Sequence, residues 1–338
     1  MNTRLAIVIL NWNGADMLHK YLPSVINNSK VDGVEVIVAD NGSTDNSIEL
    51  LKTEFLNTRL IQFDRNYGFA EGYNQALRQV EADYYLLLNS DVEIRQKDWI
   101  VPMLNYMDSH TDTCACQPKL LKLNNSDIHT FEYAGAAGGF IDRYGYPFCR
   151  GRIFDTVEDD HGQYDSIVPL HWATGAALMV RSKDYWAVGG LDGRFFAHME
   201  EIDLCWRMRL NGGMIVCIPE STAFHLGGAT LNQGNPRKTF LNFRNNLLML
   251  HKNLPESEYG KVILVRHILD FTAAMKFLLS GDAANMKAVF RATKEFRRIR
   301  NEFSRTPQRN KECQSTSPIS ILWQYYINGK RYFTQLGE

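Results

Sequence analysis

Short apolar runs alternate with polar turns and helix-spaced apolar residues along the first 90 residues. The continuous apolar runs predict buried strands over 5–10, 34–39, 59–63 and 84–88. Apolar residues at helical spacing between them predict helices over 16–26, 47–55 and 73–80. Strand, helix and strand in regular alternation predict a parallel sheet with right-handed crossovers.

The pattern continues less regularly after residue 92. A helix is predicted over 99–107, extended chain over 116–123 and 172–181, a helix opening at 200, and a strand over 216–219. Residues 124–165 are rich in glycine, aspartate and aromatic residues and have little periodicity. We expect them to form a surface lobe or lid that shapes a pocket.

Side-chain oxygens and amides follow each predicted strand of the first half. They belong to Asn11 and Asn13, Asp40 and Asn41, Asn66, and Asn89 and Asp91. Ligands of open α/β sheets bind beyond the carboxyl ends of the strands, so the sequence predicts a polar mouth there. Asp91 is a candidate ligand for a hard divalent cation that would in turn hold phosphate. The alternative is that turns are simply rich in such residues.

A second group of candidates lies later in the chain. Glu200, Glu201 and Asp203 open a predicted helix, and a carboxylate there could act as a general base. The alternative is that acids at a helix N-terminus are favoured by the helix dipole. His225 precedes a Gly-Gly pair and is a candidate metal or phosphate ligand, although a lone histidine is often structural.

Composition narrows the class of protein. The 338-residue chain is 45% hydrophobic and 22% charged, as expected of one large or two smaller globular domains. Its net charge of -1 argues against nucleic acid as a partner of the whole protein. The first half has neither G-x-G-x-x-G nor G-x-x-x-x-G-K-[ST], which argues against dinucleotide enzymes and P-loop NTPases.

The six cysteines are scattered and have poor spacing for zinc, so we expect free thiols in a reducing compartment. The N-terminal apolar run is too short for a signal peptide. The longest apolar segment, 262–279, is broken by Arg266, His267, Asp270 and Lys276, so it does not predict a bilayer-spanning helix. These features predict a cytoplasmic protein that does not cross a membrane.

The C-terminal segment has a different character. Residues 286–303 carry six lysines and arginines, with apolar residues near helical spacing. Such a basic amphipathic helix predicts contact with a membrane surface through 254–303, peripheral at the inner membrane face, or docking of a partner. The alternative is a solvated basic face on a helix packed against the rest of the protein. A homodimer is also compatible with the sequence.

The motifs over residues 5–255, taken together and in order, resemble the family 2 glycosyltransferases, and among these the bacterial rhamnosyltransferase-like members. The resemblance rests on the segments 8–13 (VILNWN), 40–45 (DNGSTD), 66–70 (NYGFA), 88–91 (LNSD), 200–207 (EEIDLCWR), 225–228 (HLGG) and 244–245 (RN). It implies the GT-A fold, a Rossmann-like mixed α/β sheet flanked by helices, and an inverting mechanism. It further implies a transferase domain over 1–253, with a nucleotide-sugar half (1–123) and an acceptor half (124–253), and a helical extension over 254–338.

The resemblance also implies roles for individual residues. Trp12 stacks on the nucleotide base, Asp40 hydrogen-bonds it, and Asn66 and Gly68 line the nucleotide cleft. The remaining nucleotide-sugar residues it implies are Asn11, Asn13, Asn74 and Asn89. Asp91 matches the last acid of the D-x-D motif, which ligates Mg²⁺ or Mn²⁺, and His225 adds a metal or phosphate contact. Glu201 occupies the place of the catalytic base.

Two residues depart from the family pattern. Asn89 replaces the first acid of D-x-D, so one negative charge is missing at the expected metal site. The base is usually the aspartate of a Glu-Asp pair, and here it is Glu201, one methylene longer; Glu200 or Asp203 are the alternatives.

The function implied is transfer of a sugar from a nucleoside diphosphate donor, a UDP- or dTDP-sugar such as dTDP-rhamnose, to a glycan or lipid-linked acceptor in cell-surface polysaccharide synthesis. One alternative is a sugar-1-phosphate nucleotidyltransferase, but 11–14 (NWNG) lacks the Gly-rich phosphate loop and the cation expected there. The other is a sugar-nucleotide-binding protein without transferase activity.

Overall fold

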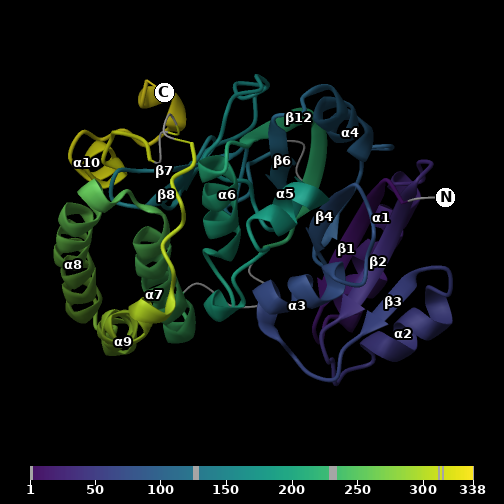
Figure 1. The fold of residues 1–338 in the computed structure, drawn as a ribbon, viewed down its shortest axis with the longest axis horizontal. Coiled ribbons are helices and arrows are strands. Elements are labelled where there is room, and N and C mark those ends of the chain that lie inside the picture. Colours follow the sequence, from purple (N-terminus) through teal and green to yellow (C-terminus); the bar gives the residue numbers. More distant parts are fainter. Residues whose placement is uncertain (1–2, 125–128, 228–233, 311–312, 314–315, 338) are drawn as a thin grey trace.

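The computed structural model describes residues 3–124, 129–227, 234–310, 313 and 316–337. Within them, eight strands form a central mixed sheet in the order β3-β2-β1-β4-β11-β6-β12-β5 (Figure 1). The strands are β1 (Leu5–Asn11), β2 (Val34–Asp40), β3 (Arg59–Gln62), β4 (Tyr84–Asn89), β5 (Val92–Glu93), β6 (Thr113–Lys122), β11 (Ala177–Arg181) and β12 (Met214–His225). The strands β1 to β4 are parallel, as the strand and helix alternation predicts, and β11 runs antiparallel to both its neighbours.

The strands of this sheet are buried on both sides because helices cover both of its faces. Leu5, Ile7 and Ile9 of β1 pack in the core that includes α1 (Ala15–Asn28), α2 (Ser47–Glu54) and α4 (Ile100–Ser109). The alternate residues Ala6 and Val8 pack in the core that includes α3 (Gly68–Leu77), α5 (Ser182–Ala187) and α6 (Glu200–Leu210). Side chains of a strand alternate between faces, so one apolar run supplies two cores.

The structure corrects the start of the third predicted helix. We expected a helix over 73–80, but α3 begins at Gly68. Gly68 has φ = 80°, which glycine adopts without strain. Gly68 and Gly72 are typical of turns, so the apolar periodicity does not indicate where this helix begins.

Residues 129–165 form the predicted lobe, and its buried side chains belong to the core that also packs Ala6 and Val8 of β1. Its four strands are β7 (Gly139–Ile141), β8 (Pro147–Cys149), β9 (Arg152–Ile153) and β10 (Thr156–Val157), which form a small separate sheet. Phe131, Phe148 and Tyr164 are buried there. The C-terminal segment covers this lobe: Phe333 lies 5.3 Å from Phe140 between ring centroids, and its N–H donates to Glu158.

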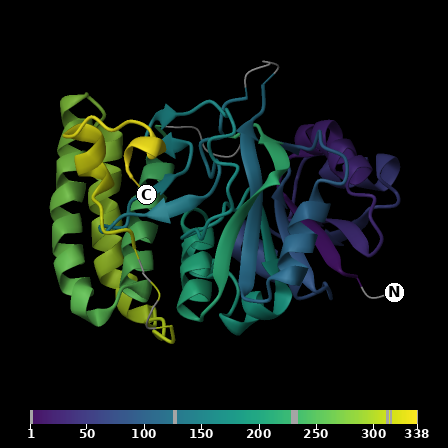
Figure 2. The same cartoon turned by 90° about the horizontal axis from the view of Figure 1, so that it is seen from above.

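Three helices form a layer at the end of the molecule opposite to the N-terminal strands (Figures 1 and 2). They are α7 (Pro236–Asn253), α8 (Glu256–Leu279) and α9 (Ala283–Ile299), and the short α10 (Ile321–Tyr326) lies at one end of α8. α7 packs on both α8 and α9, so the extension continues the layer that α7 begins. The domain boundary at residue 254 stays a prediction.

The cysteines are all free, as expected, and five of the six are buried. Among the described residues, no helix combines the length and apolarity that crossing a bilayer requires.

Candidate active site

The ends of β1 and β2 bring the first group of predicted site residues together. Asn11 and Asp40 are direct partners in the parallel register, and both side chains are buried. Asn11 Nδ2 donates to Asp40 Oδ2 at 3.0 Å and lies 3.3 Å from Ser43 Oγ. Asn11 Oδ1 is buried and has no partner among the described residues. The pair is fixed in place by the sheet, and it leaves one carbonyl oxygen free to accept a hydrogen bond.

Trp12 and Asn13 lie at the rim of this group. Asn13 has φ = 51°, and its Oδ1 accepts the Thr44 N–H at 2.7 Å, which joins the turn after β1 to the turn after β2. Trp12 is 49% exposed. An exposed indole beside the carboxyl ends of two strands has a ring face available for stacking.

Asn41 connects Asn66 and Gly68 to the ends of β1 and β2 by hydrogen bonds. The Asn41 amide donates to Asn66 Oδ1 at 3.2 Å and to the Gly68 carbonyl at 3.0 Å. Gly68 has no room for a side chain: a Cβ would lie 2.7 Å from the ring of Phe196. The next N–H, of Phe69, donates to the Phe196 carbonyl at 2.9 Å. The predicted nucleotide loop therefore touches the loop that precedes α6.

Asp91 and His225 meet because β5 pairs with the end of β12. His225 lies opposite Val92 in the antiparallel register, and its Nε2 is 3.0 Å from Asp91 Oδ1 and 3.3 Å from Asn89 Nδ2. Its Nδ1 faces Glu132 Oε1 at 3.4 Å. Burial opposes a charged imidazole, but the two carboxylates outweigh it and raise the pKa of His225 to about 10. Burial likewise opposes ionisation of Asp91, and its bond to His225 holds the Asp91 pKa below its usual value.

The donor set fits a divalent cation that is shared with phosphate. A carboxylate oxygen and an imidazole nitrogen at one point suit Mn²⁺, while Mg²⁺ prefers oxygen ligands. A metal-binding histidine usually donates its other ring N–H to a carboxylate, and Glu132 occupies that position. Among the described residues, no group of three or more side chains of His, Cys, Asp or Glu could hold a metal alone. Phosphate oxygens would have to complete the coordination.

A strained loop leads into α6. Phe196, His198 and Met199 have φ of 66°, 69° and 71°, in the left-handed region that costs non-glycine residues about 1–2 kcal/mol each. Asn245, fully buried on α7, holds this loop. Its Nδ2 lies 3.0 Å from the Phe195 carbonyl, and 2.8 Å from those of Ala197 and His198. The loop conformation is therefore imposed from outside by α7.

Glu200 and Glu201 begin α6 at the end of this loop. Burial and the neighbouring Glu201 raise the pKa of Glu200 well above its usual value, and burial also raises the pKa of Glu201. The Oε2 atom of each is buried without a partner among the described residues. Glu201 is the more exposed of the two and packs against Gly175: a Cβ on Gly175 would lie 3.5 Å from its Cβ. The carbonyl of Ala176, one residue on, accepts the Asn89 N–H at 3.0 Å.

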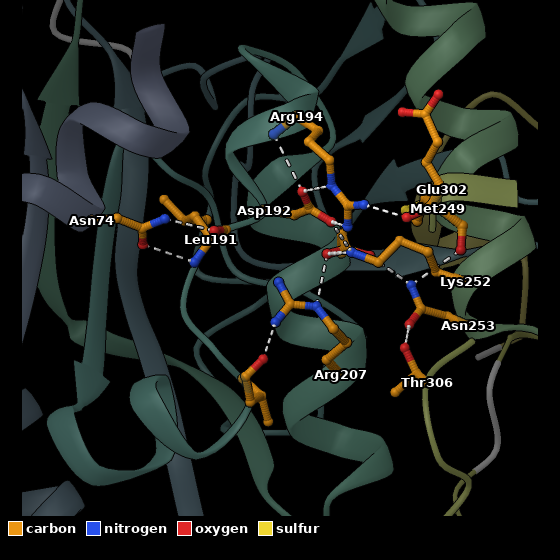
Figure 3. Close-up of polar contacts among 12 residues, drawn as sticks. Asn74, Leu191, Asp192, Arg194, Arg207, Met249, Lys252, Asn253, Glu302 and Thr306 are labelled. Carbon is orange, nitrogen blue, oxygen red and sulfur yellow. Dashed lines mark hydrogen bonds and ion pairs between the residues drawn. The ribbon is translucent and has the colours of Figure 1, made fainter. Parts of the chain in front are cut away.

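Two predicted site residues have structural contacts instead. Asp203 was an alternative base, but it is fully buried and bonds Arg207 Nε, Lys252 Nζ and Asn253 Nδ2, each at 2.8 Å (Figure 3). Burial opposes its ionisation, yet the adjacent cations lower its pKa. A carboxylate so paired is a poor proton acceptor, so we withdraw Asp203 as a base.

The sequence predicts that Asn74 binds the nucleotide sugar, and the structure gives its side chain partners within the protein. Its Oδ1 accepts the Tyr185 hydroxyl at 2.7 Å and the Leu191 N–H at 3.1 Å. Its Nδ2 donates to the Leu191 carbonyl at 2.7 Å (Figure 3). The same Nδ2 donates to Glu71 at 3.3 Å. With all its hydrogen-bonding capacity used, Asn74 ties α3 to the loop before α6.

Sequence reasoning missed Glu132. It lies in the aperiodic segment 124–165, and only the fold brings it to His225. Asn245 belongs to the motif at 244–245, and the resemblance implies no role for it. Of the predicted motif over 225–228, Gly228 lies outside the described residues.

The fold is the GT-A fold, and the family match and the relatives named below show that the protein is a glycosyltransferase. Residues 6–135 match the profile of the family "Glycosyl transferase family 2". This part of the chain is therefore a glycosyl transferase family 2 domain, as the motifs indicate.

Named relatives agree with this class. The chain is 25% identical, over 238 residues, to the N-acetylglucosaminyl-diphospho-decaprenol L-rhamnosyltransferase of Mycobacterium tuberculosis, covering 67% of this chain and 76% of the relative. It is 24% identical to the rhamnosyltransferase WbbL of Escherichia coli K12, covering 65% and 82%. Its fold is similar to that of GalNAc-T7, solved with UDP, GalNAc and Mn²⁺, with a TM-score of 0.62 and 14% identity over 97% of this chain and 57% of that one.

Proposed function

We propose that this glycosyltransferase is a rhamnosyltransferase. It would transfer the sugar of a nucleoside diphosphate donor, with dTDP-rhamnose as the first candidate, to a glycan or lipid-linked acceptor in cell-surface polysaccharide synthesis, with inversion at the anomeric carbon. The names of the M. tuberculosis and E. coli relatives support the sugar, and the former also supports a diphospho-lipid acceptor.

One observation carries the proposal: two chemical centres adjoin each other. The Asp91 and His225 pair lies at the ends of β5 and β12, and Glu201 lies against Gly175. The link between them runs through Asn89: its side chain lies 3.3 Å from His225 Nε2, and its N–H donates to the carbonyl of Ala176, the residue after Gly175. A donor whose diphosphate meets the first centre would present its sugar toward the second.

Asp91 and His225 would hold a divalent cation, Mn²⁺ or Mg²⁺, with Glu132 orienting the histidine ring. Such a cation supplies positive charge that stabilises the departing nucleoside diphosphate. Asn11, Asp40 and Asn66 would line the nucleotide side, and Trp12 would stack on the base.

Glu201 is the proposed general base, with its neighbour Glu200 as the alternative. A base removes the acceptor's hydroxyl proton as the acceptor oxygen attacks, and it works best when its pKa lies near the operating pH. Burial moves the pKa of Glu201 in that direction. Glu201 has the more accessible side chain, whereas Glu200 is only 4% exposed.

The experiment compares Glu201→Gln, Glu200→Gln and the distant surface control Glu54→Gln. We expect Glu201→Gln to retain Mn²⁺-dependent binding of the donor, measured by calorimetry, and to lose transfer by about 10²–10⁴-fold. Glu54→Gln should behave as wild type, and NMR of the product should show inverted configuration at the anomeric carbon.

Transfer at wild-type rate in Glu201→Gln would remove Glu201 from the role, and a loss confined to Glu200→Gln would assign the base to Glu200. Donor binding without any transfer or donor hydrolysis in the wild-type protein would favour the binding-protein alternative.

A further inference from the structure

The basic helix near the C-terminus does not present an apolar face to its surroundings. Its apolar residues Ala288, Val289, Ala292, Phe296 and Ile299 are buried, and α9 packs on α7 and α8. Residues 286–299 are therefore not a free amphipathic helix that could insert into a membrane. What α9 exposes is a row of cations, with Phe290 among them.

The neighbouring helix α8 has the exposed apolar stripe instead. Leu264, Ile268, Phe271 and Leu278 recur at intervals of four, three and seven residues, which places them on one side of a helix. Leu264 is 64% exposed and Ile268 is 60% exposed, and Leu279 at the end of the helix is 89% exposed. α8 lies at the outer end of the molecule (Figures 1 and 2), so the stripe faces outward.

Aromatic residues and cations flank this stripe on both sides. On the α9 side, the Phe271 and Phe290 rings lie 6.2 Å apart, and Lys294 and Arg297 line a groove of about 390 Å³ between the two helices. On the α10 side, Lys276 Nζ lies 5.7 Å from the Tyr326 ring. α10 adds Trp323, 58% exposed, and Ile327 follows it, 63% exposed.

Acids are nearly absent from this surface. From 260 to 294 the chain contains two acidic residues. Asp270 is buried against Arg266, and Asp282 caps the N-terminus of α9. At the margin of the face, Glu295 pairs with Arg298 and Asp155 lies near Tyr326, so the face combines apolar residues with cations that outnumber the acids.

We propose that this face, the exposed side of α8 with Phe290, Lys294 and Arg297 of α9 and Trp323 and Tyr326 of α10, docks the enzyme on an anionic lipid bilayer. The α8 stripe would enter the boundary between headgroups and acyl chains, and the cations would contact anionic headgroups. Tryptophan and tyrosine prefer that boundary because one end of each ring system is apolar and the other is polar.

A second copy of the chain fits this face less well. A two-fold dimer through the face would bring Lys294, Arg297 and Lys276 of both copies into one interface with few acids to pair with them. The inference does not depend on the proposed donor or acceptor, because it concerns a surface away from the residues of the active site.

The experiment is co-sedimentation of the full-length protein with vesicles of phosphatidylcholine alone, or of phosphatidylcholine with phosphatidylglycerol. We expect pelleting with the anionic vesicles, weaker at high salt. The triple variant Leu264→Gln, Ile268→Gln, Phe271→Gln should bind at least about tenfold more weakly, and Lys294→Gln with Arg297→Gln about tenfold more weakly.

Matched controls remove similar groups elsewhere. Leu56→Gln removes a 76% exposed leucine, and Lys20→Gln with Lys30→Gln removes two exposed cations on the opposite part of the molecule; both should pellet as wild type. Mn²⁺-dependent donor hydrolysis should be unchanged in the α8 variant, which separates this proposal from the proposed function.

Three results would overturn the proposal: no pelleting of the wild-type protein with anionic vesicles, equal pelleting of the α8 triple variant, or equal loss in the controls. Light scattering that finds a dimer which the triple variant dissociates, without vesicle binding, would assign the face to a second copy of the chain.

Discussion

At the scale of single residues, the chemistry of the site depends on a carboxylate that the motifs do not include. Glu132 approaches His225 from the side opposite to Asp91. A histidine held between two carboxylates keeps its ring orientation and gains basicity, which favours metal binding through the other nitrogen. In the proposed function, Glu132 would thus position His225 and would not contact the substrate.

Glu132→Gln should weaken Mn²⁺ binding by about 10–100-fold, because the amide orients the ring less well and carries no charge. Mn²⁺ affinity can be followed by electron paramagnetic resonance in the presence of nucleoside diphosphate. Glu158→Gln, in the same lobe but bonded to Tyr164, is the control, and its Mn²⁺ affinity should stay unchanged. An unchanged affinity in Glu132→Gln would contradict the positioning role.

The raised pKa of Glu201 predicts the pH dependence of turnover. The base acts only when it is deprotonated, so kcat should fall as the pH falls through the raised pKa. The acid limb should therefore lie above about 4.3, the ordinary value for glutamate. Rates are measured at saturating Mn²⁺, so that proton competition at His225 does not contribute. A limb at or below the ordinary value would contradict the assignment of Glu201.

At the scale of elements, α7 determines the shape of the loop before α6. Sequence periodicity predicts α6 and β12, but it says nothing about the left-handed conformation at Phe196, His198 and Met199. That conformation depends on the Asn245 amide, about 50 residues further along the chain. An element whose conformation is set by a distant buried amide cannot be derived from its own residues.

Asn245→Ala should reduce kcat by about 10–100-fold with a smaller change in the KM for the donor, since Glu201 loses its position while the nucleotide side stays intact. It should also destabilise the fold by about 1–3 kcal/mol, because buried carbonyls lose their donor. Asn285→Ala, on α9, is the control: it removes a buried bond to the Gly234 carbonyl and should destabilise the protein without the fall in kcat. Equal kcat losses in both variants would indicate that the lower stability of the protein, and not displacement of Glu201, reduces kcat.

At the scale of the whole molecule, the C-terminal segment packs against the elements that carry the candidate site. Lys252 and Asn253 of α7 bind Asp203 of α6, and Thr306 bonds Asn253 at 2.7 Å (Figure 3). The last described residues cover the small sheet of the lobe through Phe333. The end of α7, itself bonded by Thr306, thus holds the helix that carries the proposed base.

Asp203→Asn should destabilise the protein by up to about 3–5 kcal/mol at pH 7, because Arg207 loses its carboxylate partner and Lys252 keeps Asp192 but loses Asp203. Glu295→Gln, which breaks the exposed pair with Arg298, should change stability little. Because the pKa of Asp203 is lowered by folding, its contribution is present above the unfolded value of about 3.9 and is lost as the pH falls through the folded value. Urea unfolding of the wild type and both variants at several pH values checks both points. A stability difference between the wild type and Asp203→Asn that persisted at pH below the folded pKa of Asp203 would contradict them.

The sequence by itself determined the α/β architecture and the alternation of strands and helices from β1 to β4, because apolar periodicity is local and each parallel strand is buried on both faces. It also placed Asn11, Asp40, Asn66 and Asp91 at the ends of strands, since parallel strands deliver their carboxyl ends to one edge of the sheet.

Only the tertiary structure decided which acids remain candidates for chemistry. Asp203 and Glu201 lie two residues apart at the start of one helix, yet one is paired with buried cations and the other has an unpartnered oxygen. The tertiary structure also decides which groups Glu132 and Asn245 contact. It decides as well which face of the C-terminal helices stays exposed. Electrostatic environment and burial arise from contacts between distant segments, and no local pattern of residues contains them.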